Sequence, residues 1–285
     1  MSAVMELQHP LGIIHGLSNE AYHSGPGISK SHLPVMAKSA RAYWATYMAQ
    51  DRIKKEPTAD MVLGTAIHAA VLEPDLFADG YKVGPVVDKR TKAGKAEWED
   101  FLLLSAGCEI LTPEMYKTCL NVRDAVYAHP KAKILFREGG QSELSAFAAD
   151  EETGLLLKCR PDRMSPTGHM IDLKSINDAS EDGFTRAMVN FEYALQPPFY
   201  ADVWKAATGE TIPDFIFVAV EKTPPYDIGI YWMSKDDIDF ARAKYRRLLL
   251  RIAECRQQNE WPGINGNEPK EIKLPPYYFY KGESA

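Results

Sequence analysis

The segment from Arg160 to Lys174 constrains the fold of this chain more than any other stretch. Asp172 lies ten positions after Asp162, and Lys174 lies two positions after Asp172. Apolar runs on both sides of the Pro-Thr-Gly sequence at 166–168 predict two short strands joined by a tight turn. Residues two apart on a strand share a face, so Asp172 and Lys174 should point the same way, with Asp162 nearby on the partner strand. Such a cluster of two carboxylates and an ammonium binds a divalent cation and activates a water molecule beside it.

The Asp-x-Lys pair alone is a weak signal, because it also arises by chance at solvated strand edges. A Pro-Asp about ten residues upstream, with a turn signal between the two, makes the pattern more specific. The competing interpretation is a surface hairpin whose charges face water.

Length and composition are those of an ordinary globular protein. The chain has 285 residues, 45% of them hydrophobic and 25% charged, which is near the upper size for one hydrophobic core. No apolar stretch approaches the ~18 residues of a membrane span, and the first residues lack the pattern of a secretory signal. We expect a cytoplasmic protein with no membrane segment.

Cysteine spacing and net charge limit which metal sites and which modes of nucleic-acid binding this chain can have. The four cysteines have no C-x-x-C spacing, so we expect reduced core thiols rather than a structural zinc or an iron–sulfur cluster. A net charge of −6 argues against binding nucleic acid over the whole surface, although a local basic channel is compatible with it.

Capping and turn signals predict helices first, then a central sheet, then a helix, two strands and a last helix. The helices are expected near 29–48 (broken), 58–72, 113–129, from 180, at 198–207 and at 234–258. The strands are expected at 142–149, 155–160, 169–175, 214–221 and 228–233. This order favours an α/β fold with a central mixed β-sheet flanked by helices.

We expect one domain over residues 1–285. Within it, residues 1–28 should be irregular, and the basic stretch at 89–95 should form a mobile loop. The aromatic tail within 259–285 is expected to pack on the body or on a neighbouring subunit.

The predicted helix around His68 carries a second candidate. At about 100° per residue, His68 shares a face with Met61, Gly64, Thr65 and Leu72, so that face should turn inward. A core histidine is the commoner interpretation, and a metal ligand is the alternative. Gly64 predicts that another backbone approaches closely.

Further candidates are polar residues on neighbouring elements. Gln196 and Tyr200, four apart, would share a helix face, although the two prolines after Gln196 predict that the helix begins after it. Glu143 and Glu73 are additional acidic candidates, and Glu73 has the features of a surface acid at a helix end.

In order and spacing, these residues resemble the PD-(D/E)XK nuclease superfamily, in its RecB-like branch. The stretches 160–162 and 171–174 are similar to its core motif, 64–74 to its upstream histidine helix, and 196–200 to its Q-x-x-x-Y motif. Residues 22–33 and 218–226 resemble the catalytic domain of the RecE family (exodeoxyribonuclease VIII). The resemblance spans roughly residues 13–255 and implies a restriction-endonuclease-like core.

The resemblance also implies a Mg²⁺-dependent deoxyribonuclease that tolerates Mn²⁺. The implied metal ligands are His68, Asp162, Asp172 and the backbone carbonyl of Leu173. Lys174 would orient the attacking water and, second, help to deprotonate it. Gln196 and Tyr200 would position the DNA or steady the region around Lys174.

A RecE-like activity would degrade one strand of linear double-stranded DNA from its 5′ end and leave a 3′ overhang for a strand-annealing recombinase, as in phage-type recombination. The resemblance also implies a homo-oligomer in the form of a tetrameric ring. The composition and the spacing of residues give no information on this oligomer. Candidate contacts to the 5′ phosphate are Ser29, Lys30, Ser31 and Arg41. Candidate contacts to backbone phosphates are Lys89, Arg90, Lys92 and Lys95. Helix capping by the serines and a solvated basic loop are the simpler alternatives.

Other functions remain open on sequence alone. One is a metal-dependent endonuclease or repair nuclease on the same fold. Another is a catalytically silent protein that binds DNA ends, against which the joint presence of Asp162, Asp172 and Lys174 speaks. A third is an unrelated binding protein with a chance motif.

Overall fold

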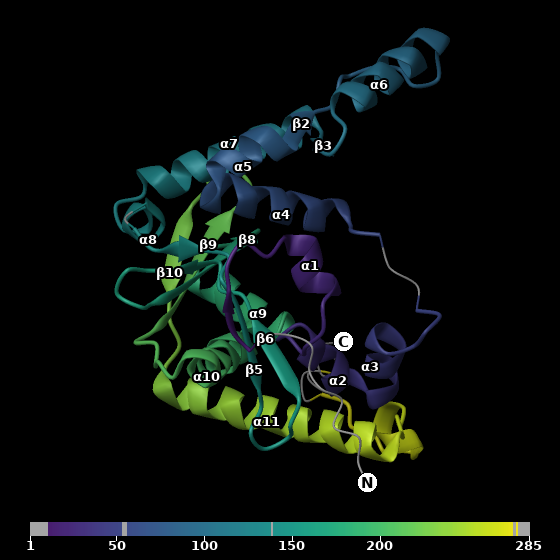
Figure 1. Cartoon of the computed structure of the whole chain (residues 1–285), viewed down its shortest axis with the longest axis vertical. Helices are drawn as coiled ribbons and strands as arrows, with labels where there is room; N and C mark the ends of the chain where they lie inside the picture. The colour runs from purple at the N-terminus through teal and green to yellow at the C-terminus, as the bar shows by residue number, and fades with distance from the viewer. Residues whose placement is uncertain (1–10, 53–55, 138, 276–277, 279–285) are drawn as a thin grey trace.

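A five-stranded mixed sheet forms the centre of the molecule (Figure 1). The computed structural model describes residues 11–52, 56–137, 139–275 and 278. In spatial order the strands are β10 (Ile228–Tyr231), β9 (Phe215–Glu221), β8 (Met170–Ile176), β7 (Arg163–Met164) and β4 (Gln141–Ser142). Strands β8 and β9 pair in parallel, and the other neighbouring pairs are antiparallel. The predicted α/β fold with a mixed sheet is confirmed.

A second, three-stranded sheet continues the hairpin that enters the central one. It has the order β1 (Gly12–Ile14), β5 (Ser145–Ala149), β6 (Leu156–Cys159). The regular strand structure is interrupted between β4 and β5 at Glu143, whose φ is +55°. It is interrupted between β6 and β7 at residues 160–162. The Glu143 N–H donates to the Asp162 carbonyl at 3.1 Å across this break. Asp162 therefore lies at a bend in the hairpin, where β-structure commonly redirects a side chain.

Helices cover both faces of the central sheet (Figure 1). One face packs against α4 (Ala59–Leu72), α5 (Pro74–Gly80), α7 (Pro113–Ala128) and α8 (Ala132–Arg137). The other packs against α2 (His32–Lys38), α3 (Ala40–Tyr47), α9 (Glu181–Asn190), α10 (Gln196–Thr208) and α11 (Lys235–Gln258).

Strand β9 shows why the sheet is buried on both sides. Phe215 and Phe217 belong to one core, and Val218 and Val220 to the other. A run that is apolar on both faces is typical of a parallel strand covered by two helical layers. Phe217 is fully buried, and its burial contributes about 2–3 kcal/mol.

Several helices begin at the predicted capping residues. The side chains of Thr58, Thr112, Ser180 and Ser234 each accept a hydrogen bond from the backbone N–H three residues later. Helix α10 ends at Gly209, which adopts a left-handed conformation with φ of 79°. These boundaries were set by local chemistry, and the predictions of them are confirmed.

The prediction of a mobile loop at 89–95 is wrong. Thr91 caps helix α6 (Lys92–Leu104), which projects from the body as an arm (Figure 1). The arm is joined to the body by a parallel pair, β2 (Tyr81–Val83) and β3 (Glu109–Leu111). Gly94 serves close packing here, because a Cβ would lie 2.2 Å from the Asp88 carbonyl oxygen.

The described part of the first 28 residues is more regular than predicted. Besides β1 it contains helix α1 (Asn19–Ser24), and both elements are too short for a periodic pattern to reveal. Two 3₁₀ turns, at Tyr193–Leu195 and Ile264–Asn267, complete the elements. Most of the aromatic segment 277–280 in the tail lies outside the described residues. Across the parts of the chain that are described, no helix is both long and apolar enough to cross a bilayer.

Candidate functional site

Strand β8 places Asp172 and Lys174 side by side, as their spacing predicts. Met170 belongs to the core on their side of the strand, whereas Ile171 and Leu173 belong to the core on the opposite side. The Lys174 ammonium forms an ion pair with Asp172 Oδ2. Asp172 is only 1% exposed, so this pair lies inside the protein rather than at a solvated strand edge.

Asp162 joins the pair from the bend in the hairpin. Its Oδ2 accepts a hydrogen bond from the Leu173 N–H at 2.7 Å. The register that aligns Arg163 with Ile171 brings this bond about. The turn closes at Gly168, whose φ of 82° suits glycine, and its N–H donates to the Ser165 carbonyl at 3.0 Å. The two carboxylates and the ammonium therefore meet, and the competing interpretation of a solvated surface hairpin is wrong.

Helix α4 brings His68 to the same place. His68 Nδ1 lies 3.4 Å from Asp162 Oδ2. Burial opposes protonation of the imidazole, but the Asp162 carboxylate outweighs it, and the pKa of His68 is raised. Gly64 is not needed for a close backbone approach, because a Cβ there would contact Ser175 Oγ at an ordinary 3.7 Å.

Glu143 lies close to Asp162 and interacts with it electrostatically. Burial and the Asp162 carboxylate raise the pKa of Glu143 to about 7, and Glu73 adds to the effect. Arg160 Nη1 lies 3.7 Å from Glu143 Oε2 and partly offsets this repulsion. Both acids that the sequence left undecided thus act on the site electrostatically, and Glu143 is the nearer partner of Asp162.

Helix α10 supplies the amide and the phenol. It begins at Gln196 itself, two residues before the predicted start at 198, and Gln196 Nε2 donates to Asp172 Oδ1. Tyr200 lies one turn later, where burial and nearby anionic groups, Asp172 among them, raise its pKa. The Tyr200 hydroxyl therefore stays protonated and is available as a donor.

Tyr193 is a neighbour of the site that sequence reasoning missed. The ammonium groups of Lys174 and Lys30 lie 4.8 and 5.1 Å from its ring centroid. Burial and the charge of Lys174 lower the pKa of Lys30 to about 8, and Lys30 Nζ donates to the Phe191 carbonyl at 3.0 Å. Tyr193 lies in a 3₁₀ turn without periodic neighbours, so no spacing rule could have singled it out.

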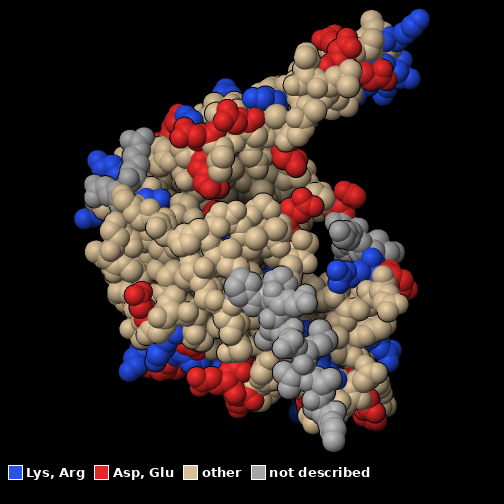
Figure 2. Space-filling view, in the orientation of Figure 1, with Lys and Arg blue, Asp and Glu red and all other residues tan. Residues whose placement is uncertain are grey.

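The other predicted DNA contacts lie elsewhere. Ser29 and Ser31 line a cavity beside α3, and Arg41 contacts Asn267 at 3.4 Å near the end of α11. The remaining four begin the arm: Lys89, Arg90, Lys92 and Lys95. Figure 2 shows Lys and Arg side chains at the far end of that arm. The structure therefore brings Lys30 to the cluster but not Arg41 or the basic residues of the arm.

The side chains of the cluster offer a partial donor set for a divalent cation. Within the described ranges, no group of three or more His, Cys, Asp or Glu side chains is placed to hold a metal ion. The Asp172 oxygens contact Lys174 and Gln196 instead. The donors nevertheless suit a hard cation, since carboxylates and an imidazole gather here and the half-buried Glu143 carboxyl resists ionisation beside Asp162. A cation would relieve that repulsion.

Two comparisons with known proteins identify the fold and the family of this chain. A solved chain from Eubacterium rectale, described as a "Putative exonuclease", matches with a TM-score of 0.60 and 16% identity, over 93% of this chain and 98% of that chain. At this identity the likeness shows a shared fold. No protein of curated function matches. The profile of a family described as "PDDEXK-like domain of unknown function (DUF3799)" matches residues 29–268, which include every member of the cluster. This chain belongs to that family of PDDEXK-like domains.

Proposed function

We propose that the protein is a Mg²⁺-dependent exonuclease that degrades one strand of linear double-stranded DNA from the 5′ end. The observation that carries the proposal is the convergence of Asp162, Asp172 and Lys174 at the bend between β6 and β8. Family membership and the fold shared with the E. rectale protein support a nuclease. The polarity rests on the resemblance of residues 22–33 and 218–226 to the RecE family.

A bound Mg²⁺ or Mn²⁺ would neutralise charge on the scissile phosphate and make a coordinated water more acidic. The groups proposed to hold it are His68, Asp162, Asp172 and the Leu173 carbonyl, with Glu143 beside them. The Leu173 N–H already holds Asp162 in place, so the same residue would serve the site through both backbone groups.

Lys174 is proposed to orient the nucleophile. Burial lowers the pKa of Lys174, but the Asp172 and Asp162 carboxylates outweigh it and the pKa is raised, so Lys174 is an ammonium at neutral pH. It can donate to the attacking water and to a phosphate oxygen, but in this state it cannot accept a proton. Gln196 would fix the direction in which Asp172 faces.

The reaction is hydrolysis of a phosphodiester. The water oxygen bonds to phosphorus and gives up a proton to solvent, the bond from phosphorus to the 3′ oxygen of the terminal nucleotide breaks, and that oxygen takes up a proton from solvent and leaves as an alcohol. Repetition from the 5′ end releases mononucleotides and leaves a 3′ overhang. We further propose a homo-oligomer, by resemblance a tetrameric ring, and a strand-annealing recombinase as the partner that takes the overhang.

A time course on linear duplex DNA with 5′ or 3′ end labels, with and without Mg²⁺, tests the proposal. We expect early loss of the 5′ label, retention of the 3′ label, no action on closed circles, and no activity without a divalent ion. Asp172→Asn should abolish digestion, whereas Asp236→Asn, at an exposed position of α11, should leave it unchanged. Cutting of closed circles would instead favour an endonuclease, and binding of ends without release of nucleotides would favour a silent end-binding protein.

A further inference from the structure

A cavity of about 1000 Å³ lies between residues 20–32, α3 and strand β6. Its floor is built by strand pairing. Ile28 bridges Leu157 in parallel, its N–H donates to the Leu156 carbonyl at 2.8 Å, and the Lys158 N–H donates to the Ile28 carbonyl at 2.9 Å. A cavity of this size is at the upper end of those that bind ligands.

One wall of the cavity holds a buried cation. Lys158 is 2% exposed, and its ammonium donates to the carbonyls of Tyr22 and Gly25 at 2.6 and 2.8 Å. No carboxylate of the described chain forms an ion pair with it, and the lining adds Arg52 and Arg256. A buried charge without a counterion is costly, so this wall favours an anionic ligand.

The lining also includes an aromatic pair. The rings of His32 and Tyr47 lie 4.0 Å apart between centroids and are tilted by 33°, and Tyr43 lies 5.3 Å from Tyr47. Hydrogen bonds hold the pair in place: His32 Nδ1 accepts from the Ser29 N–H at 3.1 Å, and the Tyr47 hydroxyl donates to the Ser31 carbonyl at 3.3 Å. Ordered rings of this kind are platforms on which bases stack.

Two segments of the chain lead from the lining of the cavity to the candidate site. Lys158 and Asp162 are four residues apart, a span of about 13 Å for extended chain. On the other side Ser29 and Ser31 line the cavity, while Lys30 between them reaches the ring of Tyr193, which Lys174 also contacts. A strand held in the cavity would therefore be close to the carboxylates.

We propose that this cavity binds single-stranded DNA, with bases stacked on the His32–Tyr47 pair and phosphates near Lys158, Arg52 and Arg256. The proposal deepens the proposed function and rests on it for the identity of the ligand, because an end that is being degraded presents an unpaired strand. Lys158 also has a structural role, since Tyr22 and Gly25 lie at the end of α1. The decisive substitutions are therefore made at the aromatic and arginine positions.

The test is fluorescence anisotropy of a labelled oligothymidylate of about 12 nucleotides, within the range of known single-strand sites. Binding is measured with the full chain in EDTA, so that no cleavage occurs. We expect Tyr47→Leu to weaken binding by about fivefold or more, which corresponds to about 1 kcal/mol for a lost stack. Tyr47→Phe keeps the ring and should bind within about twofold of the wild type. Binding of a blunt hairpin duplex should not change in either variant.

Arg52→Gln is the second variant and does not depend on the packing of Tyr47. It should weaken binding of the oligonucleotide. It should also reduce the slope of the logarithm of the binding constant against the logarithm of the salt concentration by the amount expected for about one lost phosphate contact. Arg247→Gln, at an exposed position of α11, makes the same change of charge away from the cavity and should have no effect. Circular dichroism shows whether each variant is folded, and Arg52→Gln decides the question if Tyr47→Leu is not.

The proposal is overturned if folded Tyr47→Leu and Arg52→Gln both bind the oligonucleotide like the wild type, or if single-strand and duplex binding fall equally. Poly-glutamate that competes as well as the oligonucleotide would show a site for any acidic polymer, and would also overturn it. Wild-type protein that binds the oligonucleotide but never digests DNA would overturn the proposed function and leave the cavity assignment standing. If the wild type digests DNA but the Tyr47 and Arg52 variants bind the oligonucleotide as tightly as it does, the cavity assignment is overturned and the proposed function stands.

Discussion

Among single residues, Gln196 controls how Asp172 faces the site. It is buried, and its amide donates to Asp172 Oδ1 while Lys174 contacts Oδ2. Gln196→Ala removes one of these two constraints and leaves the carboxylate free to rotate. We expect the turnover number on linear duplex to fall about 10-fold to 100-fold with little change in KM, because misplacement of a catalytic group acts on the transition state.

Gln257→Ala is the matched control, because Gln257 is exposed near the end of α11. It should digest DNA at the wild-type rate. If Gln196→Ala did so too, with its fold intact, the amide would have no part in positioning Asp172.

His32 gives the protein a pH-dependent stability. Burial first, and then the nearby Lys158 charge, lower the pKa of His32 from 6.5 to about 4. Between these values the unfolded chain binds more protons than the folded one, so stability falls as the pH drops from about 6.5 to about 4. His32→Asn retains an acceptor for the Ser29 N–H but does not titrate.

Urea unfolding at pH 7 and pH 4.5 measures this effect. The stability advantage of the wild type over His32→Asn should shrink by about 1 kcal/mol at the lower pH, less than the full shift implies because the ring is partly exposed. An advantage that stayed constant with pH would show that His32 does not titrate in this window.

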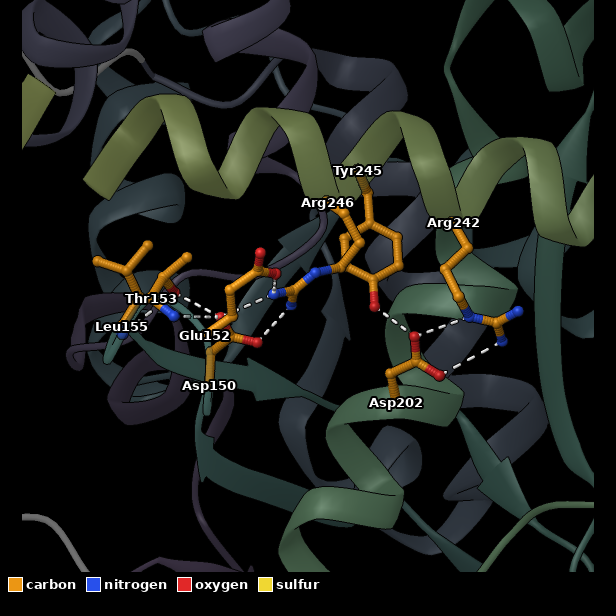
Figure 3. Close-up of polar contacts among 8 residues, drawn as sticks. All are labelled: Asp150, Glu152, Thr153, Leu155, Asp202, Arg242, Tyr245 and Arg246. Carbon is orange, nitrogen blue, oxygen red and sulfur yellow. Dashed lines mark hydrogen bonds and ion pairs between the residues drawn. The ribbon is translucent and has the colours of Figure 1, made fainter. Parts of the chain in front are cut away.

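Among the elements, α11 is held to the body by ion pairs and hydrogen bonds to acidic side chains, of which Asp150 is the least exposed (Figure 3). Arg246 forms ion pairs with Asp150 and Glu152 at the turn after β5, and Asp150 also accepts from the Thr153 N–H at 3.0 Å. Nearer the start of the helix, Arg242 and Tyr245 both contact Asp202 of α10. The Asp150 side chain is only 9% exposed, so the loss of its partner would leave a charge with little solvent.

We therefore expect Arg246→Met to lower the free energy of unfolding by about 2 kcal/mol, and the melting temperature by several degrees. Arg247→Met, one residue along on the exposed side of α11, should change stability by less than about 0.5 kcal/mol. Scanning calorimetry checks both variants. Equal melting temperatures would mean that the ion pairs contribute nothing beyond their cost of desolvation.

For the molecule as a whole, a divalent ion should act as a stabilising ligand. A cation that binds the carboxylate cluster of the folded protein raises the free energy of unfolding and with it the melting temperature. At a cation concentration 100 times the dissociation constant, the gain in free energy is about 2.7 kcal/mol. We expect Mn²⁺ and Mg²⁺ to stabilise the wild type. Asp162→Asn removes a proposed ligand and should abolish the shift. A shift that survived in this variant would place the ion elsewhere.

The sequence predicted the parts of the site that depend on local periodicity. The alternation of β8 fixed the common face of Asp172 and Lys174, and the turn at Gly168 brought Asp162 back to them. His68 followed from a helix face. Tyr193 and the position of Arg41 did not follow, because both depend on how distant elements pack. The parallel register of β8 and β9 is likewise set by two apolar faces that no local pattern encodes.

The parallel pairing of β8 with β9 has a consequence for how the protein is made. The chain that crosses between these strands contains α10, so Gln196 is delivered by the same segment that β9 must anchor. A nascent polypeptide that ends before Phe215 lacks strand β9, to which β8 is hydrogen-bonded along its whole length. The proposed site would therefore gain the support of its parallel neighbour only after the chain has been synthesised past Glu221.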